Sequence, residues 1–201
     1  RGKTIVEDLL IDDPWSEVHL PLFMMSYENI KAFKDFIAMV KIDGDISESL
    51  LDFRTLSYFS PALAGNRLQL DVSGKMSGYV DDFTFTDIDV NSRNGGFKGR
   101  ASGSLSGLPE IEKTRLRADL RDFIMTSEGL GDFVSEWMPG EKKLDIGRYA
   151  RGTVFRLNGK GSGMMNRLSV NADLTSLLGN VKADVRLDNL IRKNRPIGIS
   201  G

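Results

Sequence analysis

Apolar and polar residues alternate with a period of two along much of the chain. In the stretch 97–105, for example, phenylalanine, glycine, alanine, glycine and leucine alternate with lysine, arginine and two serines. Successive side chains of a β-strand point to opposite faces, so this pattern predicts strands with one apolar and one polar face. Such strands are typical of an antiparallel sheet that has water on one side. We therefore predict a mainly β, antiparallel fold.

The larger apolar residues of these strands form the inner face that we expect, and they are our candidate lipid-groove residues. They are Leu68, Leu70, Val72, Phe83, Phe85, Phe97, Leu116, Leu120, Phe155, Leu157, Leu168, Val170, Val181, Val185 and Leu187. The alternation slips by one residue at Asp87, which predicts a β-bulge there. Several inner positions, such as Gly99 and Ala118, are small. They leave room either for a ligand or for a closely docked helix.

Two or three short helices are expected beside the strands. Residues 127–138 place apolar side chains three and four positions apart, with Ser127 as a candidate cap and a proline and glycine after the last turn. Residues 26–40 show a similar stripe that begins at Ser26. Residues 49–61 predict a strand that passes into a short helical turn. These elements could cover part of the sheet's apolar face.

A repeat relates two glycine-rich stretches. "LDVSGKMSGYVDDFTF" at 70–85 aligns with "FRLNGKGSGMMNRLSV" at 155–170, at a constant offset of 85 residues. The second copy resembles a phosphate-binding loop, but Gly161 stands where such a loop needs serine or threonine, and strand-like alternation follows instead of a helix. We therefore interpret the glycines as turn or bulge geometry between strands.

The composition excludes several function classes. The 201 residues carry a net charge of −1, whereas nucleic-acid binding usually needs a basic surplus, so no nucleic-acid partner is expected. No cysteine is present, which excludes disulfides and thiolate chemistry. No apolar run approaches the ~18 residues that span a bilayer. The ends look cut, so we expect a piece of a longer protein.

Candidate catalytic and metal-binding residues are few. His19 is the only histidine, and it lies in a strand-like stretch without the surroundings of a catalytic triad. Asp43 and Asp45 resemble the start of a calcium loop, but Arg54 stands where the bidentate glutamate should be. The paired acids fit turns better. We predict no enzyme, no metal site and no cofactor.

The glycine-punctuated strands of residues 51–90, 95–123 and 159–190 resemble the TamB (translocation and assembly module) proteins of the AsmA-like family. The resemblance extends from about Phe53 to Leu190 and is weaker over the first fifty residues, which are richer in helical pattern. It rests on the ensemble of repeated strands, because each motif alone is weak.

This resemblance implies a sheet that curls into a taco-like trough with an apolar interior. It implies a protein of the periplasm that is anchored to the inner membrane by an N-terminal segment outside this chain. Phospholipid acyl chains are the implied partners in the trough. An outer-membrane barrel assembly protein is the implied partner of other parts of the full-length chain. The function implied is phospholipid transport to the outer membrane, or protein assembly in it.

The residues themselves leave an alternative open. A sheet with one apolar face must hide that face, either in an open trough lined by acyl chains or in a sealed core such as a sandwich. The alternative function is thus a structural or adhesive β-repeat module that binds protein partners. We expect three regions: a mixed helix and strand part at 1–60, a first β-repeat unit at 61–145 and a shorter second unit at 146–201, divided within the connection 140–152.

Overall fold

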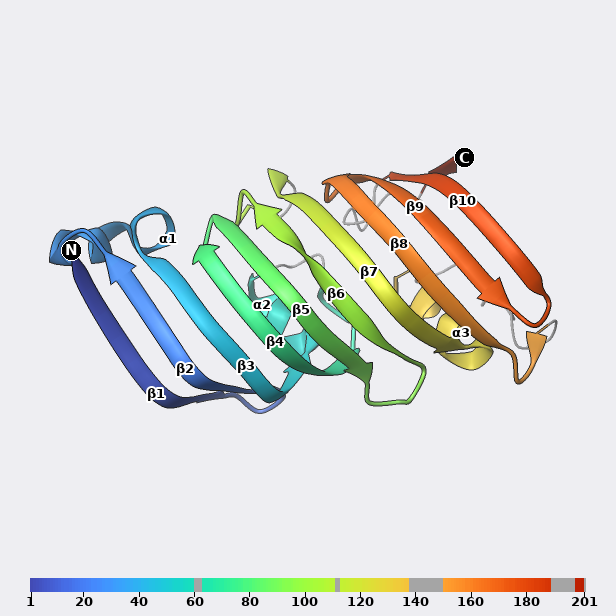
Figure 1. Cartoon of the computed structure of the whole chain (residues 1–201), viewed down its shortest axis with the longest axis horizontal. Helices are drawn as coiled ribbons and strands as arrows, with labels where there is room; N and C mark the ends of the chain where they lie inside the picture. Colours follow the sequence, from blue (N-terminus) through green and yellow to red (C-terminus); the bar gives the residue numbers. More distant parts are fainter. Residues whose placement is uncertain (60–62, 111–112, 138–149, 189–197, 201) are drawn as a thin grey trace.

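One antiparallel sheet forms the framework of the molecule (Figure 1). The structure, a computed structural model, describes residues 1–59, 63–110, 113–137, 150–188 and 198–200. Each strand pairs with the next strand along the chain, so the spatial order of the strands is the order of the sequence. The predicted mainly β, antiparallel class is confirmed, and the sheet is curled and not closed into a barrel.

The strands are ten to twelve residues long except for the last. They are β1 (Gly2–Asp12), β2 (Glu17–Tyr27), β3 (Lys41–Asp52), β4 (Gln69–Tyr79), β5 (Asp82–Ser92), β6 (Phe97–Ser106), β7 (Arg115–Thr126), β8 (Val154–Met164), β9 (Arg167–Ser176), β10 (Gly179–Asp188) and β11 (Gly198–Ser200). β7 and β8 pair along their whole length, so the sheet is continuous across the expected division at 140–152, most of which lies outside the described residues.

The three helical stretches form where the apolar spacing predicted them. A 3₁₀ turn η1 (Ile30–Asp35) runs into α1 (Phe36–Met39), α2 (Phe53–Phe59) follows β3 directly, and α3 (Ser127–Trp137) follows β7. Both expected caps were wrong, one by three residues and the other by one. Asn29, not Ser26, accepts the backbone bond that starts η1, because Ser26 is still paired in β2. Thr126, not Ser127, accepts the amide of Gly129.

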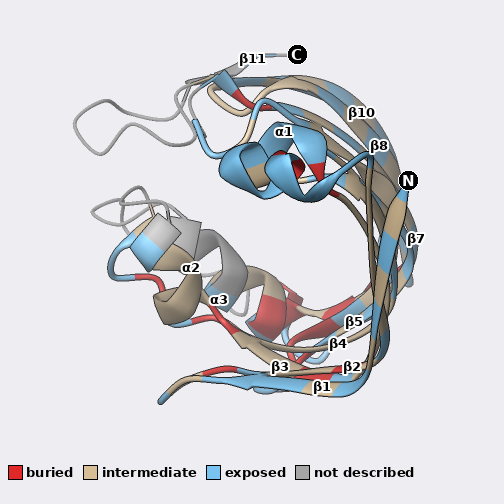
Figure 2. Ribbon diagram, turned by 90° about the vertical axis from the view of Figure 1, so that its left-hand side faces the viewer, coloured by how far each residue is buried: buried red, intermediate tan, exposed pale blue. Residues whose placement is uncertain are grey.

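A row of β-bulges bends the sheet into a curl. Asp8, Glu48, Asp87 and Asp122 have φ between 45° and 52°, and they lie on β1, β3, β5 and β7. The pairing register shifts beside the last three of them. A bulge bends its strand and increases the local twist, so bulges on alternate strands fold the two ends of the strands toward each other. Figure 2 shows the resulting curl. The predicted bulge at Asp87 is confirmed.

Equivalent glycines occupy equivalent places in the two repeat copies. Gly78 and Gly163 have φ of 130° and 143°, near the turns that join β4 to β5 and β8 to β9. A Cβ atom at either position would collide with a backbone oxygen of the next strand, Asp82 O or Arg167 O. The interpretation of these glycines as strand geometry is therefore confirmed for Gly78 and Gly163, and the repeat relates β4–β6 to β8–β10.

Candidate functional site: the concave apolar face

Cross-strand pairing brings the predicted inner residues to one side of the sheet, because directly paired side chains point the same way. One row joins Phe83, Leu105, Leu116, Gly163, Leu168 and Leu187, and the next joins Phe85, Gly103, Ala118, Gly161, Val170 and Val185. Further rows join Val72 with Val90, Leu120 with Gly159, Phe97 with Phe155 through Met125, and Leu157 with Val181 through Leu174. Leu70 lies two positions before Val72 on β4, and Leu68 precedes this strand.

This side of the sheet is concave. Phe53 of α2 and Leu130 of α3 pack against its buried residues, and Figure 2 places both helices inside the curl. We call the whole surface the concave face. Its described strand positions carry no charged side chain between β4 and β10.

One part of the concave face is covered, and we call it the closed half. Its buried centre is Leu68, Phe97, Phe123 and Met125. The rings of Phe97 and Phe123 stack with centroids 6.3 Å apart. α3 lies so close that a Cβ at Gly129 would collide with the backbone of Gly96. Here the apolar face is a core sealed by helices, one of the two outcomes that the sequence left open.

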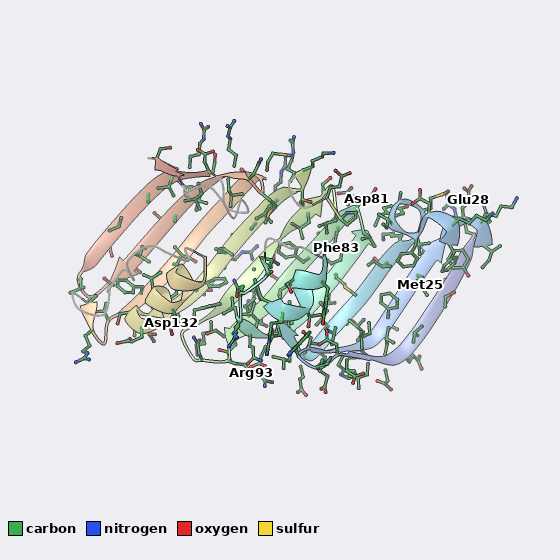
Figure 3. The ribbon with its side chains drawn as sticks, turned by 180° about the vertical axis from the view of Figure 1, so that it is seen from behind. Met25, Glu28, Asp81, Phe83, Arg93 and Asp132 are labelled. Atoms are coloured by element: carbon green, nitrogen blue, oxygen red, sulfur yellow. The ribbon has the colours of Figure 1, made fainter. Side chains whose placement is uncertain are left out.

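The other part of the concave face is not covered in the same way, and we call it the open half. It comprises Phe83, Phe85, Leu105, Leu116, Leu168, Val170, Val185 and Leu187, on the far side of the bulges. All of them are apolar, yet each keeps an intermediate exposure, and none belongs to the buried set. Figure 3 looks onto the concave face, and its labelled Phe83 lies on the part that α2 and α3 leave uncovered.

Sequence reasoning missed several members of the concave face. Phe123 and Met125 were not among the candidates, because the bulge at Asp122 shifts the phase of β7 after Leu120. The slip from Leu120 to Phe123 was a usable signal of the same kind as the one at Asp87. The first strands were also missed. Phe23 of β2 faces Gly44, and through Met76 this row continues into Phe85.

The charged residues collect on the convex face, in cross-strand pairs. Arg93 bonds to Asp71 at 2.8 Å, Arg100 to Asp89 at 3.1 Å, and Arg167 to Asp188 at 3.1 Å. All six side chains are at least one-third exposed, so each pair contributes little stability, about 0–1 kcal/mol. Their position nevertheless leaves one face of the sheet wetted and charged and the other apolar.

A hollow of about 480 Å³ lies on the convex side of the sheet. It is lined by acids and bases together, including Glu48, Asp122 and Lys98. Three of its six charged lining residues are already in ion pairs, because Arg93 pairs with Asp71 and Arg100 with Asp89. Among the described residues, no group of three or more acidic or histidine side chains could hold a metal ion.

The other candidate residues from the sequence include His19 and Asp43, and both make ordinary structural contacts. His19 lies in β2, with Nε2 3.9 Å from the exposed carboxylate of Asp8. Asp43 accepts bonds from Lys41 Nζ and Ser77 Oγ. Burial raises the pKa of Asp43, but these two bonds outweigh it, and its pKa is lowered. None of the described helices is long and apolar enough to cross a membrane.

Comparison of the chain with protein-family models, curated proteins and solved structures found no match.

Proposed function

We propose that this chain is a non-enzymatic segment of a cell-envelope bridge protein, and that its concave face holds phospholipid acyl chains. In this proposal the protein belongs with the TamB and AsmA-like proteins and resides in the periplasm, anchored to the inner membrane by an N-terminal segment outside this chain. It serves phospholipid transport to the outer membrane or protein assembly in it. Other parts of the full-length chain contact the outer-membrane barrel partner. No cofactor takes part.

The observation that carries the proposal is a concave face whose described strand positions from β4 to β10 carry no charge and whose open half stays partly exposed. Monomeric proteins rarely keep a long row of apolar side chains in contact with water unless the row binds something. The row from Phe83 to Leu187 crosses six strands, or roughly 24 Å at a strand spacing of ~4.8 Å. An acyl chain along this row would gain ~0.8 kcal/mol for each buried methylene.

Small residues deepen the centre of the open half. Gly103, Ala118 and Gly161 lie in one row between Phe85 and Val170, and Gly163 interrupts the leucine row beside it. A chain lying across the strands would contact backbone at Gly161 and Gly163. At Gly103 it would contact the ring of Phe85, whose Cζ lies 2.8 Å from where a Cβ would stand. These rows run across the strands, along the axis of the curled sheet. This direction suits transfer of an acyl chain along the sheet.

Binding of phospholipid to the purified chain tests this proposal. Leu116→Glu places a carboxylate in the open half, whereas Arg117→Glu makes a larger change of charge at the next residue, on the convex face. We expect Leu116→Glu to lower the binding of a fluorescent phospholipid at least ~10-fold, and Arg117→Glu to leave it within ~2-fold. Equal effects of the two variants, or no binding to the wild-type chain after folding is verified, would refute the proposal.

A second candidate function rests on a different observation. β1 is an edge strand of the described sheet, and its Ile5 and Leu10 are 53% and 54% exposed on the convex side. An exposed apolar edge strand can add a strand from a partner protein. If the chain is instead a structural or adhesive module, Ile5→Lys should abolish partner binding and should not change lipid binding.

A further inference from the structure

Helix α2 covers part of the closed half, although it is short. It has seven residues, and a helix of this length has little stability of its own in water. Phe53 at its first position packs against the buried centre, and Phe53 N donates to Leu68 O at 3.0 Å. Tyr58 near its other end is 68% exposed. The apolar attachment is therefore concentrated at the N-terminal end of the helix.

Polar contacts hold the next residues of α2. The carboxylate of Asp52, whose side chain is fully buried, accepts from Arg54 N at 2.7 Å and from Arg54 Nε at 2.9 Å. Its second oxygen accepts from the Arg54 guanidinium at 2.5 Å and from Gln69 Nε2 of β4 at 2.9 Å. A buried carboxylate needs such partners, because an unpaired charge there would be costly.

The turn between β1 and β2 supplies the other side of the attachment. Asp13 accepts from Trp15 N and Ser16 N, which fixes the shape of this turn. Thr55 of α2 donates to Asp13 at 3.1 Å, and the hydroxyls of Ser16 and Thr55 are 2.7 Å apart. The Ser16 hydroxyl also accepts from Asp52 N at 2.9 Å.

The indole of Trp15 completes the attachment, because it packs against two side chains of α2. The Arg54 guanidinium lies 5.4 Å from its ring centroid, and the ring of Tyr58 is 5.7 Å away. A cation over an indole is attracted by the negative face of the ring. We call these residues of the turn, with Asp52 on β3, the latch.

We propose that α2 is a movable cover fastened by this latch, and that its release, which withdraws Phe53 from the buried centre, opens the closed half to an acyl chain. Most of the contacts that fasten the body of the helix are polar. Release of α2 also exposes the Asp52 carboxylate, so water can replace the bonds that it loses. Opening therefore costs far less than unfolding the sheet, as is usual for lids near binding sites.

The identity of the ligand as an acyl chain rests on the proposed function, whereas the release of α2 does not. With α2 in place, the concave face offers an acyl chain only the open half. With α2 released, the side chains around Leu68 and Phe97 join the surface that runs from Phe83 onward, and more phospholipid is held on each chain. The cover thus sets how much of the concave face is available.

A reversible lock tests the cover. The chain has no native cysteine, so Ser16→Cys combined with Thr55→Cys gives one disulfide across the latch that a reductant breaks. Hydrogen exchange of the α2 amides reports the motion without lipid, and native mass spectrometry reports the phospholipid bound per chain. We expect the oxidised form to slow exchange of the α2 amides at least ~10-fold relative to the reduced form, and to bind less phospholipid.

A second variant keeps the test decisive if the disulfide does not form. Arg54→Gln removes the ion pair and the contact with Trp15, and it should speed exchange of the α2 amides and raise the bound phospholipid. Arg100→Gln removes an ion pair of the convex face and serves as the matched control, with no expected change. The cover is refuted if α2 exchanges as slowly as β4 in every form, or if lipid binds equally to the locked and released forms. Absence of lipid from all forms refutes the proposed function instead.

Discussion

The division of the concave face into two halves predicts unequal costs for the same substitution. Phe123 lies in the closed half, is 8% exposed and stacks on Phe97. Phe83 lies in the open half, paired with Gly78 and Leu105, and is partly exposed. Phe123→Ala leaves a cavity that the helices keep closed. Phe83→Ala leaves a dent that water fills.

The magnitudes follow from burial. Truncation of a buried phenylalanine costs about 3–5 kcal/mol, which includes the lost transfer free energy and the cavity. At Phe83 there is no sealed cavity and part of the ring is already in water, so we expect about 1–2 kcal/mol. Phe123→Ala should therefore destabilise the chain by about 2 kcal/mol more than Phe83→Ala does.

Urea denaturation of the lipid-free chain, followed by circular dichroism, measures both free energies of unfolding. The slope of the transition should be the same for the two variants, which shows that they unfold from similar states. Equal losses of 3 kcal/mol or more would mean that Phe83 also lies in a sealed core. The open half would then not exist, and the proposed groove would be refuted.

Further substitutions test the local geometry and the latch. Gly163→Ala should cost about 1–3 kcal/mol in urea denaturation, because its φ of 143° is strained for alanine, whereas Gly161→Ala, where a Cβ would meet nothing nearer than 3.8 Å, should stay within ~0.5 kcal/mol. Equal costs would contradict the assigned geometry. Burial raises the pKa of Asp52, but hydrogen bonds from Arg54 and Gln69 outweigh this effect, and the pKa is lowered. Backbone hydrogen bonds lower the pKa of Asp13. Stability from both carboxylates is complete above their unfolded pKa of about 3.9 and is lost as the pH falls below it. Thermal melting against pH should show this loss, and Asp52→Asn should weaken it; an unchanged pH profile would contradict the role of Asp52.

The sequence was sufficient for the parts of the fold that follow from local periodicity. Strict alternation determines which side chains of a strand share a face, so the common face of Phe83, Leu116, Leu168 and Leu187 could be predicted, whereas the rows that they form depend on the pairing register. The bulge at Asp87 could be predicted for the same reason, since a slip of phase has a single geometric cause. α3 could be predicted because its apolar spacing differs from that of the strand before it.

The covering of the face could not be predicted, because it depends on contacts between distant segments. Nothing local shows that Phe53 and Leu130 meet the same buried cluster, or that Trp15 lies under Arg54. Alternation likewise does not distinguish an inner side chain in water from one beneath a helix. The sequence therefore left the open trough and the sealed core as alternatives, and the structure contains a half of each kind.

Photo-crosslinking of the chain in the presence of phospholipid vesicles tests the central claim most directly. A photoreactive residue is placed at Leu116 or Leu168 in the open half, at Phe123 in the closed half, and at Arg117 or Ser169 on the convex face. The account predicts phospholipid adducts at Leu116 and Leu168 and none at the convex positions, with Phe123 giving fewer adducts than the open half. Adducts at the convex positions as often as in the open half, or none in the open half of a folded chain, would contradict it.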